Sequence, residues 1–518
     1  MATASASVRN NAGGTAYAHG PEHALAQLAV TGCFNNTYYV SGASQLDKVL
    51  ELAKQCDPEY VAKLALYARQ KGMMKDMPAF LTAYLSTVSS ELLLDVFPSV
   101  INNGKMLRNF VQIMRSGAVG RKSLGTAPKR LVRAWFDTRS PETVLFNSVG
   151  NDPSLADVIK MVHPKPSTPQ KAALYAYFIG KEYETKDLPE GLQLYLQFKG
   201  NASTWENALP EVPFELLTGE QLSLTGWKML AEQATWNQTR QALNTFHRHD
   251  VFKDTGMVKL IADKLRDPEQ VRKWKAFPYQ LMMTFVNISP EIPREIAKAL
   301  ENAMEVATEN IPVLDGDVYI CPDVSGSMGS PVSGDRVGKS GKPTPPSKVR
   351  CIDVAALVAA SVLRTNPHAV VLPFDGKVRD DVKLNPKSSV LTNAQILAKV
   401  PGGSTACSAP LKRINDQKGN INSILYVSDY ESWRDGYDGY GHLGTATTMS
   451  AEWNKARNRC PNAKLICIDV TPNDTTQVNN RGDSLNVGGF SDDVFKVVSN
   501  FISGSGQQWV DQIRATPL

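Results

Sequence analysis

From about residue 20 to residue 310, hydrophobic positions recur with the spacing of amphipathic helices. Apolar residues stand three and four apart, as Leu46, Val49 and Leu50 do, which predicts one buried face per segment. Prolines begin several of these segments and glycines follow their ends, as Pro58 and Gly72 do. The segments predicted to be helical include 44–55, 58–72, 105–116, 154–163, 168–180, 224–235, 237–247, 257–265, 278–286 and 293–307.

Strand signals are scarce in this half of the chain, and the connections between the predicted helices are short. Helices of a few turns with short connections favour antiparallel pairs stacked as a solenoid of degenerate repeats, since no exact period is present. A compact, irregular helical domain is the alternative.

From about residue 311, apolar strands alternate with amphipathic helices. Strands are predicted at 318–321, 369–373, 423–428 and 464–470, and helices at 349–364, 393–400, 407–416 and 449–459. This alternation is typical of a doubly wound α/β domain with a parallel sheet. We therefore expect two domains, a helical one at 1–310 and an α/β one at 311–518.

Oxygen-bearing side chains follow two of the predicted strands. Asp323, Ser325 and Ser327 come after the first strand as Asp-x-Ser-x-Ser, and Asp429 ends the third. Thr405 lies in a glycine-containing loop between them. Carboxylates and hydroxyls suit a small, hard cation such as Mg²⁺. The set resembles the metal-ion-dependent adhesion site (MIDAS) of von Willebrand A (vWA) domains, although Asp-x-Ser-x-Ser alone also fits a turn with helix-capping residues.

Basic residues cluster in the middle of the helical half. Gly120 to Arg133 holds Arg121, Lys122, Lys129, Arg130 and Arg133. A basic cluster beside a flexible glycine loop suits phosphate groups, although a solvated helix face explains it equally.

A second polar cluster follows Trp236 and contains Asn237, Thr239 and Arg240. Amide, hydroxyl and guanidinium groups beside an aromatic ring could bind single-stranded RNA. Helix capping and packing are the alternative explanation for the same residues.

Composition places the chain among globular proteins but does not by itself identify a partner. The 518 residues are 42% hydrophobic and 21% charged, and the formal net charge is only +5. Seven cysteines without a Cys-x-x-Cys pair favour free thiols in a reducing compartment, so we expect a cytoplasmic protein. No P-loop, Ser–His–Asp arrangement or paired acids with a hydrolytic motif stands out, so we expect no enzyme.

Several segments together resemble the TROVE-domain (Ro) family, and bacterial members most closely. They are Asn11-Ala12-Gly13-Gly14, the stretch Lys71 to Phe80, and Trp236 to Phe246, followed by Asp323-Val324-Ser325-Gly326-Ser327-Met328. The resemblance covers residues 10–518. It implies HEAT-like helical repeats closed into a ring, together with a vWA domain, in a monomeric protein.

The resemblance also implies what the protein binds. Family members bind small non-coding Y RNA on the ring surface and pass single-stranded 3′ ends of misfolded RNA through the ring. His163 matches a family histidine at the Y RNA surface, but residues 143–150 lack the basic residues of vertebrate members. Ribonucleases, notably polynucleotide phosphorylase, are the implied protein partners.

Three hypotheses follow from these features. The first is a non-enzymatic RNA-binding scaffold for RNA quality control or maturation. The second is a metal-dependent protein-binding module of the vWA type, with the helices as support. The third, a metal-dependent nuclease, lacks a general base or a second metal cluster.

Overall fold

The computed structural model describes residues 8–32, 42–274, 276, 278–309, 311–332, 336–337, 343–344, 347–436, 447–489, 492–505 and 508–518. Internal packing divides the chain into two compact units. The A-domain unit comprises the described parts of Met1–Met77, Lys275–Asn287 and Met304–Pro517, and the helical unit those of Pro78–Trp274 and Ile288–Ala303.

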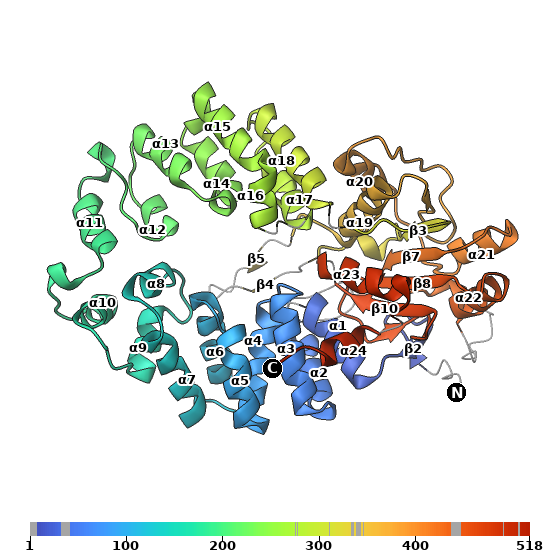
Figure 1. Ribbon diagram of the computed structural model, residues 1–518, viewed down its shortest axis with the longest axis horizontal. Coiled ribbons are helices and arrows are strands. Elements are labelled where there is room, and N and C mark those ends of the chain that lie inside the picture. Colours follow the sequence, from blue (N-terminus) through green and yellow to red (C-terminus); the bar gives the residue numbers. More distant parts are fainter. Residues whose placement is uncertain are drawn as a thin grey trace. The chain divides into compact units, whose positions relative to one another are not determined.

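In the helical unit, helix follows helix, as the hydrophobic spacing predicts (Figure 1). The successive helices are α4 (Asp76–Val88), α5 (Ser90–Val100), α6 (Gly104–Ser116), α7 (Thr126–Asp137), α8 (Pro141–Phe146), α9 (Leu155–Val162), α10 (Pro169–Ile179), α11 (Glu190–Lys199), α12 (Phe214–Thr218), α13 (Leu224–Gln233), α14 (Trp236–Arg248), α15 (Thr255–Arg266) and α16 (Pro268–Lys273). Helix α18 (Arg294–Ala307) has residues in both units, and so does α4, whose first two residues belong to the A-domain unit.

Local sequence signals set the ends of these helices. Asn103 caps α6 by accepting a hydrogen bond from the Met106 backbone at 3.0 Å, and Gly117 ends it in the left-handed conformation. Ser154 and Asp157 form a reciprocal capping box at the start of α9. In the core, the Phe97 and Phe110 rings meet edge to face, so α5 and α6 are held by apolar packing.

The A-domain unit contains a five-stranded parallel sheet in the order β10-β8-β7-β3-β6, which confirms the predicted α/β fold. Its strands are β3 (Val318–Pro322), β6 (Val370–Val371), β7 (Ser423–Ser428), β8 (Lys464–Asp469) and β10 (Ser484–Gly488). β6 is shorter than predicted, and β10 was not predicted. Chain order reverses at β3 and β7, so side chains after these two strands meet at a topological switch point.

Helices and buried side chains cover the sheet. Cys321, Tyr426 and Cys467 belong to one hydrophobic cluster with Leu411 of α21 and Trp453 of α22. The helices after β3 are α19 (Cys351–Thr365), α20 (Val390–Ala398), α21 (Ala409–Asp416), α22 (Thr448–Arg459), α23 (Asp492–Asn500) and α24 (Trp509–Arg514). Alternate residues along a strand, such as Ile424 and Tyr426 of β7, face this cluster.

The N-terminal segment packs on the same unit. Its elements are β1 (Val8–Arg9), β2 (Thr15–Ala18), α1 (Pro21–Thr31), α2 (Gly42–Gln55) and α3 (Pro58–Gln70), and α17 (Pro278–Asn287) also lies in this unit. β2 pairs with β9 (Thr475–Thr476) in a small second sheet. The side chain of Gln27 donates to the carbonyl of Thr471, and that of Trp509 donates to the Tyr67 hydroxyl. The predicted division at residue 310 follows the change from helices to alternating strands and helices. Packing instead places α1, α2 and α3 in the same unit as the parallel sheet.

Candidate functional site

The loop after β3 holds Asp323 in a fixed, buried position. The Asp323 side chain is fully buried, and its backbone N–H donates to Val427 of β7 at 2.9 Å. One carboxylate oxygen accepts from the Ser325 backbone at 2.8 Å, and the other accepts from the Ser428 hydroxyl at 2.6 Å. The hydroxyls of Ser325 and Ser327 are 3.3 Å apart. The Asp-x-Ser-x-Ser segment therefore forms one compact group of oxygen atoms.

Asp429 and Thr405 lie on the two loops beside this group. Asp429 is 3% exposed and accepts from the Glu431 backbone at 3.2 Å. Thr405 is also 3% exposed. The Gly326 N–H donates to the carbonyl of Gly403 at 2.9 Å, which places the Thr405 loop against the first loop. All five predicted metal ligands thus come from three adjoining loops.

The electrostatics of the two carboxylates fit a cation. Burial raises the pKa of Asp323, and the neighbouring charge of Asp429 raises it further. Burial also raises the pKa of Asp429. Neither forms an ion pair with Lys, Arg or His among the described residues. A positive charge bound between them would offset both the burial and the repulsion.

The donor set consists of two carboxylates and three hydroxyls, without nitrogen or sulfur. Across the described ranges, no group of three or more His, Cys, Asp or Glu side chains is placed to hold a metal ion. A site here therefore depends on the hydroxyls of Ser325, Ser327 and Thr405. Such oxygen-only sets suit Mg²⁺, which keeps several waters, better than the softer transition metals.

Two further acids lie near this site and were missed by the sequence reasoning. Asp375 follows β6, is 8% exposed, and pairs with Arg379 at 3.1 Å. Its carbonyl accepts from the backbone of Ala406, the residue after Thr405. Glu431 is fully buried, and burial raises its pKa to about 7. Both follow strand ends, and that position is the signal that could have found them.

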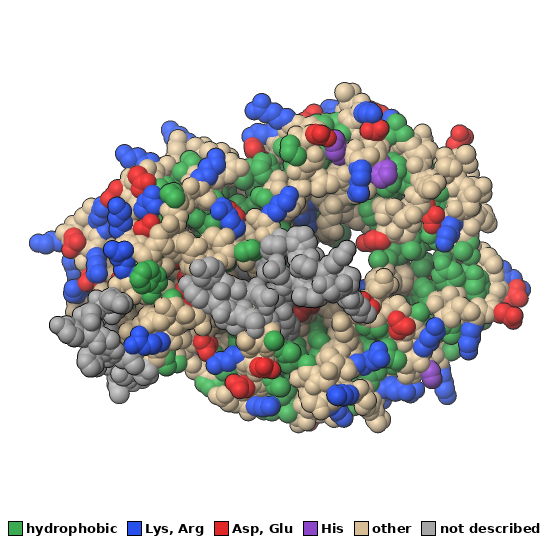
Figure 2. All heavy atoms as spheres, turned by 180° about the vertical axis from the view of Figure 1, so that it is seen from behind, with side chains coloured by type: hydrophobic (Ala, Val, Ile, Leu, Met, Phe, Trp, Pro, Cys, Tyr) green, Lys and Arg blue, Asp and Glu red, His purple; other side chains and the backbone are tan. Residues whose placement is uncertain are grey.

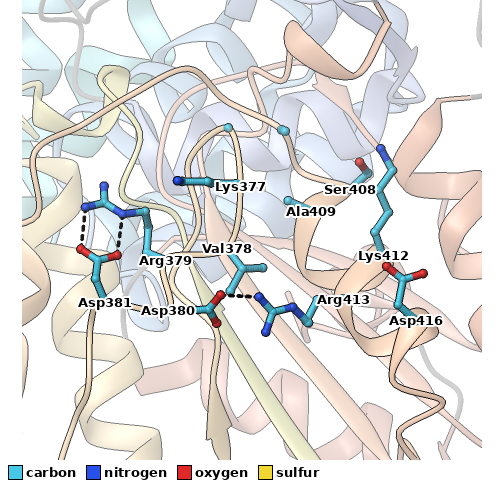
Figure 3. A pocket seen from close by; sticks show the side chains of 12 residues that line it. Lys377, Val378, Arg379, Asp380, Asp381, Ser408, Ala409, Lys412, Arg413 and Asp416 are labelled. Carbon is cyan, nitrogen blue, oxygen red and sulfur yellow. Dashed lines mark hydrogen bonds and ion pairs between the residues drawn. The ribbon is translucent and has the colours of Figure 1, made fainter.

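A pocket of about 720 Å³ opens beside the Thr405 loop. It is lined by residues 376–381, by Ala406, Ser408 and Ala409, and by the exposed side of α21 (Figure 3). Arg379 pairs with Asp381 and Arg413 pairs with Asp380. Four of the charged side chains that line the pocket are therefore already in ion pairs. Lys377 and Lys412 are exposed, and neither has an ion-pair partner among the described residues.

The first basic cluster lies in the helical unit, on and before α7. Arg121 is half-buried and donates to the carbonyl of Ser86 at 2.8 Å. Lys122 and Arg130 are exposed and Lys129 is half-buried. Arg121 therefore partly anchors its loop, whereas the other three present charge at the surface.

The structure joins this cluster to His163. The exposed side chain of Arg133 donates to the carbonyl of Val162 at 2.5 Å. His163 follows directly, ends α9 in the left-handed conformation, and is exposed. Residues 30 positions apart in sequence therefore share one surface of the helical unit.

The second predicted cluster is less suited to RNA contact. Thr239 is fully buried and its hydroxyl donates to the carbonyl of Ala234, so we withdraw it as a surface contact. Arg240 donates to the side chain of Asn237 at 2.9 Å, and burial lowers its pKa. The Arg240 guanidinium lies 6.0 Å from the Trp236 ring centroid. Packing therefore explains much of this cluster, and only Asn237 and Arg240 are partly accessible.

On the face drawn in Figure 2, Lys and Arg side chains are interspersed with Asp and Glu. This mixture agrees with the small net charge of +5. No helix in the described ranges is long and apolar enough to cross a lipid bilayer.

Comparisons with known proteins agree with the two-part architecture. Residues 318–502 match the family model of the Ro60 vWA domain. The chain is 23% identical over 534 residues to the RNA-binding protein RO60 of Deinococcus radiodurans, covering 96% of this chain and 95% of that one. The crystal structure of the Deinococcus radiodurans RO (RSR) protein matches with a TM-score of 0.63 at 19% identity, covering 94% of this chain and all of that one. The resemblance to the Ro proteins is thereby confirmed: the chain has the fold of the RO (RSR) protein, and its residues 318–502 match the Ro60 vWA domain.

Proposed function

We propose that the protein is a non-enzymatic RNA-binding scaffold of the Ro type. The main support is the likeness, over nearly its whole length, to a protein named for RNA binding. The surface that joins the α7 cluster to His163 is the proposed site for a structured, Y-like non-coding RNA. As the resemblance implies, the helical repeats form a ring that receives single-stranded 3′ ends of misfolded RNA. In this proposal ribonucleases such as polynucleotide phosphorylase complete the processing.

The identity of the RNA can be tested by purifying the protein from native cells, with and without RNase, and sequencing what is bound. A discrete structured RNA, together with fragments that have protruding 3′ ends, is the expected result. Recovery of the protein free of RNA under gentle conditions would contradict the proposal.

The site can be tested by charge removal in the helical unit. The triple variant Lys122/Lys129/Arg130→Ala removes three surface charges. With fewer phosphate contacts, RNA binding releases fewer counterions. The slope of log affinity against log salt should therefore flatten by about 2–3. The triple variant Lys181/Lys186/Lys199→Ala is the matched control, because these exposed lysines lie in the same unit outside the cluster. Equal slopes for the two variants would refute the site.

We propose a second function for the A-domain unit, the metal-dependent capture of an acidic protein partner. Its support is the buried pair Asp323 and Asp429, together with exposed Gly326, Gly402 and Gly403 at the entrance. Glycines there would let a partner's carboxylate approach a bound Mg²⁺ closely. Lys377 and Lys412, beside the same loop, would favour acidic residues flanking that carboxylate.

Partner capture from native cells, with Mg²⁺ or with a chelator, tests this second function. A partner that needs Mg²⁺ should be lost with EDTA. It should also bind more weakly to Lys377/Lys412→Glu, whose reversed charges would repel acidic residues. A partner retained equally by the chelated protein and by this variant would exclude both the metal and the pocket from its binding.

A further inference from the structure

The hairpin at the N-terminal end of the described chain lies against the loop that carries Asp429. β1 and β2 pair in antiparallel fashion, and Asn10 to Gly14 form the turn between them. The turn is held internally by the Asn10 side chain, which accepts from the Gly14 backbone at 2.7 Å. β2 then pairs with β9, which anchors the hairpin to the A-domain unit.

The turn supplies hydrogen bonds to a buried acid near the metal site. The side chain of Asn11 donates to one carboxylate oxygen of Glu431 at 2.7 Å. The backbone N–H of Ala12 donates to the other oxygen at 3.0 Å. Glu431 is fully buried and has no ion pair with Lys, Arg or His among the described residues. A buried carboxylate without such donors is costly, so the turn compensates for the burial of Glu431.

The turn also packs directly on the next residue of that loop. The Asn10 side chain donates to the carbonyl of Ser432 at 2.8 Å. A Cβ atom placed on Gly14 would lie 1.8 Å from the same carbonyl oxygen, closer than any side chain allows. Glycine is therefore required at position 14 for the turn to reach the loop.

Glu431 and Ser432 in turn hold two of the predicted metal ligands. The Glu431 backbone donates to the Asp429 carboxylate at 3.2 Å. The Ser432 hydroxyl donates to the carbonyl of Thr405 at 3.4 Å. Asn473, whose side chain donates to the Asp429 carbonyl at 2.6 Å, also lies within 3.4 Å of the Asn11 amide. The two residues that the turn contacts, Glu431 and Ser432, are thus each hydrogen-bonded to a predicted ligand.

From this chain of contacts we infer that the turn Asn10–Gly14 is a positioning element of the metal site. It holds Asp429 and Thr405 in place, so cation affinity depends on Asn11, which lies 420 residues from Glu431 in sequence. The inference rests on the proposed metal site. Partners that orient metal ligands typically contribute about 10–100-fold to metal affinity.

The test is Mn²⁺ binding to the purified full chain, measured by calorimetry, with Mg²⁺ as competitor. Asn11→Ala removes one donor to Glu431, and Gly14→Ala pushes the turn off Ser432. Gly20→Ala is the matched control, because a Cβ there meets no atom within 4 Å. Asp323→Ala reports on the metal site itself. Thermal melting without metal shows whether each variant is folded.

We expect the Kd of Asn11→Ala to rise about 10–100-fold, with Gly14→Ala affected at least as much and Gly20→Ala unchanged. Asn11→Ala is the milder variant and decides the matter if Gly14→Ala does not fold. Wild-type affinity in a folded Asn11→Ala variant, alongside loss of binding in Asp323→Ala, would overturn the positioning role alone. Absence of Mn²⁺ binding by the wild-type chain would overturn the metal site and this inference with it.

Discussion

The two candidate binding regions differ in how their side chains are held. In the A-domain unit, the five predicted ligands are each at most 9% exposed, and both carboxylates are fixed by hydrogen bonds. In the helical unit, Lys122 and Arg130 are exposed. The first region is preorganised for a small ion, whereas the second can adapt to a large, charged surface.

This difference follows from the size of the ligand. A divalent cation needs oxygen atoms placed within tenths of an ångström, which buried loops at strand ends provide. RNA phosphates are many and tolerant of position, so long basic side chains on helices suffice. The structure therefore predicts that the metal region responds to changes in the core and the RNA region mainly to changes in charge.

A matched pair of core substitutions tests this contrast with the largest expected effect. Phe110 and Phe374 are both fully buried, and each packs edge to face on another aromatic ring. Removing either ring should lower the free energy of unfolding by about 3–5 kcal/mol. Phe374→Ala should also weaken Mn²⁺ binding, because loss of the ring lets the backbone at this position shift, and its carbonyl accepts from Val324 in the metal loop.

Denaturant unfolding and calorimetry on both variants provide the measurement. Phe110→Ala serves as the control for general destabilisation, since its helices belong to the helical unit. Equal loss of Mn²⁺ affinity in the two variants would show that the metal site responds to overall stability and not to its local packing.

The second prediction separates the two binding activities. Asp323→Ala removes a ligand whose two oxygens are both fixed, so Mn²⁺ affinity should fall by at least about 100-fold. Affinity for RNA should remain within about twofold, because the α7 surface belongs to the other unit. Calorimetry and filter binding measure the two quantities on one preparation. Asp416→Ala, which removes an exposed carboxylate from α21, is the control. A parallel loss of RNA affinity in Asp323→Ala alone would show that the activities are coupled.

Acid should destabilise the A-domain unit through His23. Burial lowers the pKa of His23 well below its usual value, and the stacked His19 ring lowers it further. The unfolded chain therefore binds a proton below about pH 6.5 that the folded chain does not. Stability present at pH 7.5 is lost as the pH falls, by about 2 kcal/mol at pH 5 for this group.

Unfolding free energies at pH 7.5 and pH 5 measure this effect. His23→Gln should show a loss on acidification that is smaller by about 2 kcal/mol. The exposed His368→Gln in the same unit should behave as the wild type does. An unchanged pH dependence in His23→Gln would assign the acid sensitivity to other groups.

Much of this architecture could be predicted because its signals are local. Helices of the helical unit carry their own caps and apolar faces, as Asn103 and Ser154 illustrate. Asp323 and Asp429 could be placed together because parallel strands end at one edge of a sheet. β10 was missed because Ser484–Gly488 contains the polar Asn486, which is buried and accepts from the Thr476 hydroxyl. That contact exists only after folding.

Long-range contacts explain the remaining gaps between sequence and structure. Nothing near Asn11 in sequence indicates that it meets Glu431, because the two are brought together by β2 pairing with β9. Thr239 was predicted to be a surface hydroxyl, but its position on α14 buries it in the core. Glu431 was overlooked because its donors lie at the other end of the chain.

The finest distinction concerns Arg133, which is either one more charge or a positioning group for His163. Its Nε atom donates to the Val162 carbonyl directly before His163. Arg133→Lys keeps the charge but loses the planar group that reaches this carbonyl. If the bond positions His163, RNA affinity should fall by about 2–10-fold, the equivalent of one hydrogen bond, with the salt slope unchanged. Arg130→Lys is the control, since the Arg130 side chain is exposed on the same helix and has no hydrogen-bond partner among the described residues. Wild-type affinity in Arg133→Lys would instead mean that charge alone matters on this surface. Binding would then depend on the geometry of the ligands in the A-domain unit and on charge alone at the α7 surface of the helical unit.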